Sequence, residues 1–258
     1  MSHWVYPAVM AHRCGGALAP ENTLPGLGVT VALGGRGVEF DVMLSADGTP
    51  WVIHDETLDR TTDAAGQVCA RTDAALATVD AGCRHHKAFR GTPLSDFAAV
   101  MFACRACGLL TNIEIKPATG HERETGLVVA RTLMQQGWDQ PEALVLSSFS
   151  EESLEAAAEV APHLPRGLLI DRIPDDWAQR CKRLGAMAIH TNCAYLTQEQ
   201  TAAVRKAGLC VAVYTENDPA HARTLRTWGV DCVITDRPDI VTEAALSSVA
   251  SQDLAAKA

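Results

Sequence analysis

The stretch of sequence that decides the fold runs from Gly37 to Asp55 and reads GVEFDVMLSADGTPWVIHD. Its first eight residues predict a strand, because side chains alternate between two faces and every second one is apolar. Glu39 and Asp41 therefore share the face opposite the apolar one. Two carboxylates at such a place would destabilise a core, so the pair indicates a site for a cation or for proton chemistry.

The second half of this stretch predicts a hairpin that returns a histidine toward the two acids. Asp47-Gly48 is a turn dipeptide. The apolar run 51–53 that follows it leads directly into His54. Because imidazole titrates near neutral pH, the hairpin would deliver a group able to exchange protons close to Glu39 and Asp41.

The composition is that of a soluble globular protein rather than a disordered or membrane-spanning one, with 47% hydrophobic and 21% charged residues among 258. A net charge of −9 argues against binding to nucleic acid or to an anionic membrane. No signal peptide is evident, and nine cysteines without a disulfide pattern suit a reducing compartment. We therefore expect a cytoplasmic protein with a small-molecule partner, no nucleic acid and no stable membrane association; no oligomeric state is indicated.

Short apolar segments alternate with amphipathic helical patterns along the chain. Eight strands are expected, at 8–12, 37–44, 112–116, 143–147, 167–170, 187–190, 209–214 and 231–235. Helical patterns lie between them, at 23–33, 93–107, 122–136, 151–160, 175–184, 197–207 and 219–228.

This alternation predicts an α/β protein with a (β/α)8 TIM barrel, which it favours over an open doubly wound sheet. No Gly-x-Gly-x-x-Gly turn follows the first strand, so the usual support for a dinucleotide-binding sheet is absent. No linker divides the chain, and we expect one domain over residues 1–258. Residues 56–91 are polar and lack a long periodic segment, which predicts a small insertion after the second strand that lies over the mouth of the barrel. Residues 247–258 are expected to fray.

A barrel of this kind builds its active site at the C-terminal ends of the strands. His12 and Arg13 end the first expected strand, and Glu114 and Lys116 share one face of the third. Together with Glu39 and Asp41, Glu114 would form an all-oxygen site suited to a hard divalent cation. Pairing with a nearby Arg or Lys is a common explanation for one such acid, but a poor one for three.

Three further groups complete the expected site. His12 and His54 are the candidates for acid and base, while Arg13 and Lys116 would supply positive charge for an anionic substrate. Tyr214 ends another strand, where it either lines the pocket or belongs to the core of the barrel rim.

Taken in order, these motifs resemble the glycerophosphodiester phosphodiesterase family, in particular its bacterial cytoplasmic member associated with glycerol-3-phosphate uptake. The resemblance covers nearly the whole chain. It rests on His12-Arg13, Pro20-Glu-Asn-Thr23, Glu39-Phe-Asp-Val42, His54-Asp55, Leu58-Asp-Arg-Thr-Thr62, Glu114-Ile-Lys116 and Tyr214-Thr-Glu-Asn217.

The resemblance implies a barrel enzyme that hydrolyses glycerophosphodiesters, such as glycerophosphocholine or glycerophosphoethanolamine, to sn-glycerol 3-phosphate and an alcohol. It also implies one divalent cation, with Mg²⁺ expected first and Ca²⁺ or Mn²⁺ as alternatives. The ligands would be Glu39, Asp41 and Glu114. Catalytic histidines would be His12 and His54, and phosphate contacts would come from Arg13 and Lys116.

Two residues depart from the family pattern. Cys14 stands where a glycine usually follows His-Arg and could narrow the space beside the phosphate, and Glu216 replaces an apolar residue. Two other functions are compatible with the motifs. One is a non-catalytic barrel that binds a phosphometabolite, which the presence of both histidines disfavours. The other is a lysophospholipid-cleaving phosphodiesterase, which would want an apolar patch or an amphipathic segment near the mouth, and the polar segment 56–91 offers little of either.

Overall fold

Eight parallel strands close into a barrel, which confirms the predicted fold. The computed structural model describes residues 4–247. In the sheet, β1 pairs with both β9 and β2, so the strand order returns on itself. Each barrel strand lies within two residues of its predicted bounds. These strands are β1 (Val9–Ala11), β2 (Gly37–Leu44), β4 (Leu110–Ile115), β5 (Leu144–Ser148), β6 (Arg166–Ile170), β7 (Ala188–Asn192), β8 (Cys210–Tyr214) and β9 (Cys232–Thr235).

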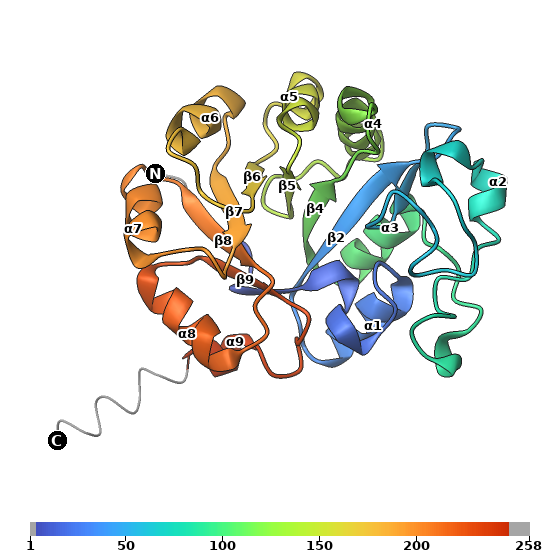
Figure 1. Cartoon of the computed structure of the whole chain (residues 1–258), viewed down its shortest axis with the longest axis horizontal. Coiled ribbons are helices and arrows are strands. Elements are labelled where there is room, and N and C mark those ends of the chain that lie inside the picture. Colours follow the sequence, from blue (N-terminus) through green and yellow to red (C-terminus); the bar gives the residue numbers. More distant parts are fainter. Residues whose placement is uncertain (1–3, 248–258) are drawn as a thin grey trace.

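Helices surround the barrel (Figure 1). They are α1 (Leu24–Ala32), α3 (Phe97–Ala106), α4 (Glu122–Gln135), α5 (Glu151–Val160), α6 (Trp177–Leu184), α7 (Gln198–Lys206) and α8 (Pro219–Trp228), with the shorter α2 (Asp73–Leu76) and α9 (Glu243–Ser247). Helix α3 begins four residues later than its pattern predicts. The reason is Asp96, whose carboxylate accepts the N–H of Ala99 and so caps the helix at that point. None of the described helices combines the length and the hydropathy that a membrane crossing requires.

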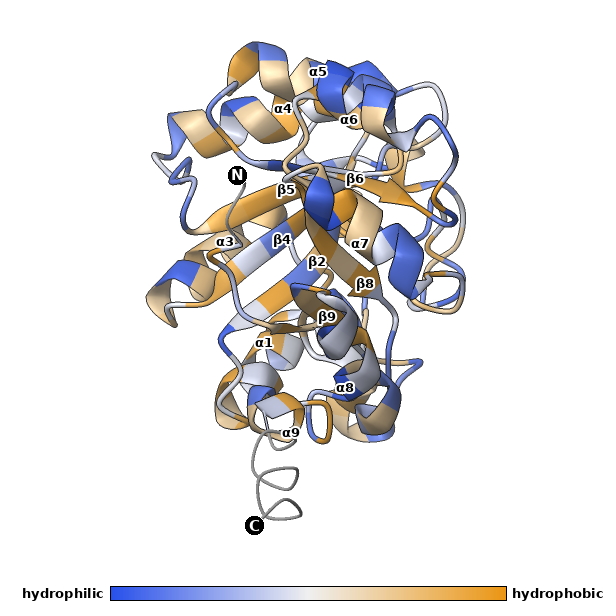
Figure 2. Ribbon diagram, turned by 90° about the vertical axis from the view of Figure 1, so that its left-hand side faces the viewer, coloured by the Kyte–Doolittle hydropathy of each residue, from blue (hydrophilic) through white to orange (hydrophobic). Residues whose placement is uncertain are grey.

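The main core lies between the barrel strands and the helices. Val38, Phe40 and Val42, the apolar face of β2, are fully buried in this core, where the rings of Phe40 and of Phe97 on α3 lie 6.2 Å apart. In Figure 2, β5, β6 and β8 are largely hydrophobic, whereas β2 and β4 include hydrophilic stretches. The alternation of side chains along β2 therefore acts as predicted: one face of the strand is buried in the core, and Glu39 and Asp41 point away from it.

A second, smaller core lies beside the barrel. Strand β3 (Pro50–Val52) pairs antiparallel with the end of β2, and the chain from there to α3 folds around a buried apolar cluster at that side (Figure 1). The cluster contains Trp51, Leu58, Val68 and Leu76. The polar composition of residues 56–91 hides this core, because its apolar residues follow no regular period. The expected frayed tail lies outside the described residues, apart from Ser247 at the end of α9.

Candidate active site

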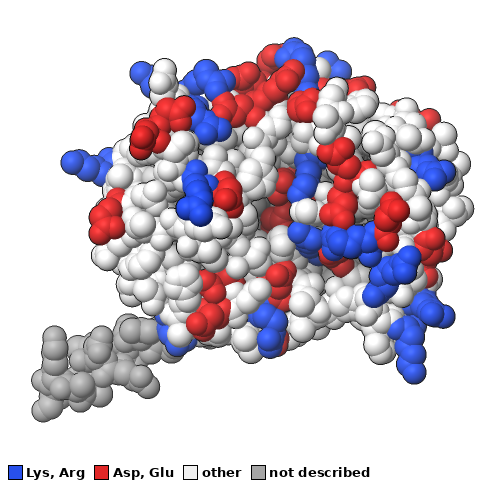
Figure 3. All heavy atoms as spheres, in the orientation of Figure 1, with Lys and Arg blue, Asp and Glu red and all other residues white. Residues whose placement is uncertain are grey.

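A cavity of about 430 Å³ opens at the C-terminal ends of the barrel strands. In the space-filling view, acidic and basic side chains meet in a hollow near the centre of this face (Figure 3). Residues from all around the barrel line the cavity: His12, Arg13, Glu39, His54, Asn112, Glu114, Lys116, Phe149, Leu169, Asn192, Tyr214, Thr215 and Ile234. No residue of segment 56–91 is among them, so this segment flanks the mouth rather than covering it.

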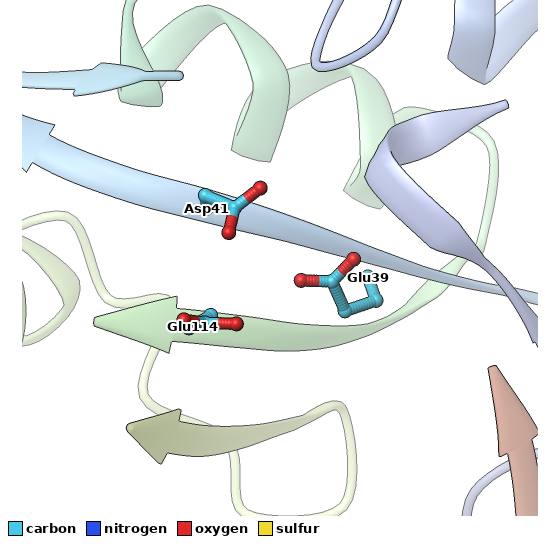
Figure 4. Close-up of side chains that lie close together, drawn as sticks. All are labelled: Glu39, Asp41 and Glu114. Carbon is cyan, nitrogen blue, oxygen red and sulfur yellow. The ribbon is translucent and has the colours of Figure 1, made fainter. Parts of the chain in front are cut away.

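The three predicted acids lie together. Glu39 and Asp41 come from β2 and Glu114 from β4, where the strand register places Asp41 beside Glu114. Each offers one oxygen, and these oxygens lie within 4.8 Å of one another (Figure 4). All three residues are at most 9% exposed. Among residues 4–247 they form the one such group of His, Cys, Asp or Glu ligands that could hold a metal ion.

The electrostatics of this group favour a cation. Burial, and then the charge of Asp41, raise the pKa of Glu39 to about 7 and the pKa of Glu114 well above its usual value. Burial would also raise the pKa of Asp41, but Lys116, His54 and Arg13 outweigh it and the pKa is lowered. Three buried carboxylates therefore cannot all be ionised without further positive charge. A hard divalent ion with oxygen ligands fits this donor set.

Both predicted phosphate-binding cations border the acids. The ammonium of Lys116, directly after β4, lies 3.5 Å from Asp41 and 3.7 Å from Glu114. Arg13 donates its backbone N–H to Glu39 at 2.9 Å, and its side-chain Nε lies 4.0 Å from Asp41. Both side chains keep partial exposure toward the cavity, at 25% and 19%. An anionic group entering the cavity would thus meet two cations beside the acids.

The loop after β1 is shaped by three residues with left-handed backbone angles. Arg13, Cys14 and Asn22 have φ values of 48°, 75° and 60°. Asn22 donates its side-chain N–H to Asp41 at 2.9 Å and so orders the acid cluster. Cys14 is fully buried in the main core and does not line the cavity. It therefore does not narrow the space beside a phosphate, contrary to the expectation from sequence. Its positive φ explains why glycine suits this position.

His12 lies directly after β1 and is held by an acid from the far end of the chain. Its Nδ1 donates to Asp236 at 2.6 Å, and its Nε2 lies 3.9 Å from Glu39. Asp236 follows β9 and is itself held by Asn217. Burial lowers the pKa of His12, but the bond to Asp236 and the charge of Glu39 outweigh it, so the pKa is raised. The sequence offers one signal for Asp236, namely an acid just past a predicted strand.

His54 is oriented by its neighbour in sequence. Its Nδ1 donates to Asp55 at 2.6 Å. Burial lowers the pKa of His54, and the charge of Asp41 and the hydrogen bond to Asp55 do not restore it. With both histidines bound through Nδ1, Nε2 of each ring is left for the cavity.

Uncharged side chains form the rest of the cavity wall. Tyr214 lines the cavity, which was one of the two alternatives expected for it. Its hydroxyl donates to the carbonyl of Ile170 at 3.1 Å, and its ring meets that of Phe149 edge-on at 5.9 Å. Phe149 is 49% exposed at the rim. Glu216 is buried away from the cavity, where it accepts the N–H of Asp218. Sequence reasoning did not identify Phe149, Leu169 or Ile234, because nothing in an apolar residue marks it as lining a cavity rather than a core.

With this geometry, the chain can be compared with known proteins. The Glycerophosphoryl diester phosphodiesterase family matches residues 12–240. The chain belongs to this family. It is 31% identical to a glycerophosphodiester phosphodiesterase of Caldanaerobacter subterraneus, over 90% of this chain and 94% of that one. Both the recognised family and the enzyme class are thereby confirmed.

Solved structures agree with this membership. A phosphodiesterase of Oleispira antarctica, solved in complex with the product sn-glycerol-3-phosphate, superposes with a TM-score of 0.89 at 33% identity, over 94% of this chain and 98% of that one. A glycerophosphodiester phosphodiesterase of Agrobacterium tumefaciens superposes with a TM-score of 0.75 at 30% identity, over 90% and 97%. The barrel of this chain is therefore the barrel of its family.

Proposed function

We propose that the protein hydrolyses glycerophosphodiesters, such as glycerophosphocholine and glycerophosphoethanolamine, to sn-glycerol 3-phosphate and an alcohol, with the help of a divalent cation. The observation that carries this proposal is one cavity in which three buried acids lie beside two histidines, each bound to a carboxylate through Nδ1. The product in the Oleispira antarctica structure supports the substrate class.

Glu39, Asp41 and Glu114 would hold the cation, Mg²⁺ first and Ca²⁺ or Mn²⁺ as alternatives. When bound, such an ion neutralises charge on a phosphoryl oxygen and lowers the pKa of a coordinated hydroxyl. The donor set supports this proposal because it contains oxygen ligands alone. The raised pKa values of Glu39 and Glu114 support it too, since burial and the charge of Asp41 disfavour the ionised forms of these two acids and further positive charge would stabilise them.

The two histidines divide the proton transfers. His54 has a lowered pKa and is neutral at pH 7, so its Nε2 can accept the proton of the attacking oxygen, whether that belongs to the neighbouring glycerol hydroxyl or to water. His12, bound to Asp236, would then donate a proton to the departing alcohol oxygen. Each carboxylate keeps its ring in the tautomer with the proton on Nδ1 and stabilises the charged form when it appears.

The remaining cavity residues bind the substrate. Arg13 and Lys116 would contact the phosphate oxygens, which concentrates positive charge at one point of a chain with net charge −9. Tyr214 would line the space taken by the organic part of the substrate. We further propose that the protein acts in the cytoplasm on small molecules. All nine cysteines are free, as expected in a reducing compartment.

The test is turnover of glycerophosphocholine by the purified protein in the presence of Mg²⁺, Mn²⁺ or Ca²⁺, measured as released glycerol 3-phosphate. His54→Ala should abolish release, whereas His163→Ala should not, because His163 is an exposed histidine paired with Asp139 away from the cavity. No release with any of the three cations would overturn the proposal. Binding of the intact diester without turnover would indicate the non-catalytic alternative, and preferred cleavage of a lysophospholipid would indicate the lipid-specific one.

A further inference from the structure

One guanidinium, that of Arg60, joins the supports of two cavity residues. It donates to Asp55 through Nε at 2.6 Å and through Nη2 at 3.0 Å. It also donates to Glu21 through Nη1 at 2.9 Å and through Nη2 at 2.7 Å. Arg60 thus makes a two-pronged contact with each of two carboxylates that come from different loops, and it lies outside the cavity itself.

Each of these carboxylates continues to a residue of the cavity. Asp55 accepts the Nδ1 proton of His54 at 2.6 Å, and Glu21 accepts from Nη1 of Arg13 at 2.9 Å. A continuous series of hydrogen bonds therefore runs from His54 through Asp55, Arg60 and Glu21 to Arg13. It connects the proposed base with a proposed phosphate ligand, and both of these side chains line the cavity.

We propose that Arg60 is a positioning residue for the reaction, which sets His54 and Arg13 in one fixed relation by bridging Asp55 and Glu21. This inference rests on the proposed function. A planar guanidinium can meet two carboxylates with paired, parallel bonds, so both acids are fixed in direction as well as in distance. Lysine, a point charge on a flexible stem, would attract both acids without fixing either.

The charges of the two acids agree with this role. The bond to Arg60 is the main cause of the lowered pKa of Asp55. Burial raises the pKa of Glu21, but its contacts with Arg60 and Arg13 outweigh burial and lower it. Both carboxylates are therefore ionised at neutral pH and act only as acceptors. Each must then receive its hydrogen bonds from the cavity residue on one side and from Arg60 on the other.

The fold also holds Arg60 itself in place. Its neighbours Leu58 and Thr62 are 1% and 0% exposed, and the Thr62 hydroxyl donates to the carbonyl of Leu58 at 2.6 Å. Leu58 belongs to the small core beside the barrel. The segment that flanks the mouth thus supplies a rigid base for a side chain that is itself half-exposed, at 49%. This gives the flanking segment a function in the site without any direct contact with the cavity.

The first test compares Arg60→Gln, Arg60→Lys and the matched control Arg123→Gln, all measured with glycerophosphocholine. Arg123 also makes a two-pronged contact with one carboxylate, Glu159, at similar exposure but on the helical outside of the barrel. Arg60→Gln should lower kcat/KM by roughly 10- to 100-fold, the usual effect of losing a partner that orients a site residue. Arg60→Lys should fall between Arg60→Gln and the unaltered protein. If Arg60→Gln matches Arg123→Gln, the inference fails.

The second test asks whether Arg60 couples Asp55 to Glu21, so that the loss of activity caused by changing one acid depends on the other. No hydrogen bond joins Asp55 to Glu21 directly among the contacts of the described residues, so their shared partner is Arg60. The single variants Asp55→Asn and Glu21→Gln and their double variant should therefore show non-additive losses of kcat/KM in the presence of Arg60. The same cycle in the Arg60→Gln background should be additive. Additivity in both backgrounds would overturn the inference.

The third test needs no turnover and so separates failure of this inference from failure of the proposed function. In nitrogen NMR of the histidine rings, His54 should carry its proton on Nδ1 in the unaltered protein and in Arg123→Gln. In Arg60→Gln the two tautomers of His54 should mix, because Asp55 is free to turn. An unchanged Nδ1–H signal in folded Arg60→Gln, as judged by its thermal melting, would contradict the role of Arg60 even if the enzyme hydrolyses glycerophosphodiesters normally.

Discussion

The two halves of the barrel mouth are built from the same strand and helix units but carry opposite kinds of side chain. From β1, β2, β4 and the hairpin, the cavity receives mostly ionisable groups: His12, Arg13, Glu39, His54, Glu114 and Lys116, with Asn112 as the neutral member. From β5 to β9, it receives uncharged groups alone: Phe149, Leu169, Asn192, Tyr214, Thr215 and Ile234. We refer to these as the charged half and the neutral half.

The difference teaches how one fold divides two tasks. The charged half gathers acids and cations that depend on one another, as the raised pKa of Glu39 and the lowered pKa of Asp41 indicate. The neutral half presents apolar and aromatic surface, which excludes water and so strengthens the charge interactions opposite it. The two halves also meet at one boundary, where β9 pairs with β1 and Asp236, directly after β9, orients His12. Chemistry is therefore expected from one half and substrate fit from the other.

The sharpest way to test this division is to remove one polar side chain from each half. His12→Ala should lower kcat by about 10²- to 10⁴-fold, the usual value of a general acid or base. Asn192→Ala in the neutral half should cost about tenfold or less, the value of one hydrogen bond to a substrate. Steady-state kinetics with glycerophosphocholine measures both. Equal losses would mean that the two halves do not divide the work as described.

Removal of divalent cations should act on the charged half alone. Treatment with a chelator is expected to lower activity on the order of 10³-fold, since a bound ion stabilises the transition state by several kcal/mol. Added Mg²⁺, Mn²⁺ or Ca²⁺ should restore the activity, and Glu114→Gln should weaken cation binding in calorimetric titration. Full activity after exhaustive chelation would contradict the assignment of Glu39, Asp41 and Glu114.

The support that Asp236 gives to His12, at the boundary between the two halves, is tested by Asp236→Asn. An amide cannot stabilise a charged His12 ring, so kcat should fall roughly 10- to 100-fold. Asp239→Asn is the matched control, because Asp239 binds the exposed Arg237 and not a cavity residue. A loss no larger than that of the control would show that Asp236 does not act through His12.

The pH dependence of kcat/KM tests the role of His54. Protonation of a base removes activity, and burial lowers the pKa of His54, so the acidic limb should lie below pH 6.5, with a tenfold loss for each pH unit under the pKa. Asp41 and Asp55 oppose this shift, while Lys116 and Arg13 add to it. Asp55→Ala should therefore move the limb to still lower pH. A limb above pH 6.5 in the unaltered protein would favour the opposite assignment of the histidines.

The smallest effect is expected at the rim of the neutral half. Phe149→Ala removes a half-exposed ring and should raise KM for glycerophosphocholine by about fivefold, which corresponds to about 1 kcal/mol of lost contact, with kcat little changed. Phe102→Ala, on α3 and 71% exposed outside the cavity, is the control. A fall in kcat with KM unchanged would place Phe149 in the chemistry rather than in substrate fit.

The charged half could largely be located from sequence because its signals are local. Alternation in β2 places Glu39 and Asp41 on one face, and the position of Glu114 in the next barrel strand adds the third acid. In the neutral half, the sequence predicted only Tyr214 as a cavity residue, and only as one of two alternatives. An apolar side chain at a strand end reads the same whether it lines a cavity or fills a core, and only the packing of neighbouring strands decides between the two.

By itself, then, the sequence determined the strand and helix alternation, the barrel class and the residues able to exchange protons or bind a cation, because period and residue chemistry are local properties. The tertiary structure decided which of them meet. Closure between β1 and β9 brings Asp236 to His12, 224 positions away, and the fold beside the barrel brings Arg60 to Glu21, 39 positions away. The tertiary structure also places the side chain of Cys14 in the core rather than in the cavity. These outcomes depend on long-range register and packing, which no local pattern contains.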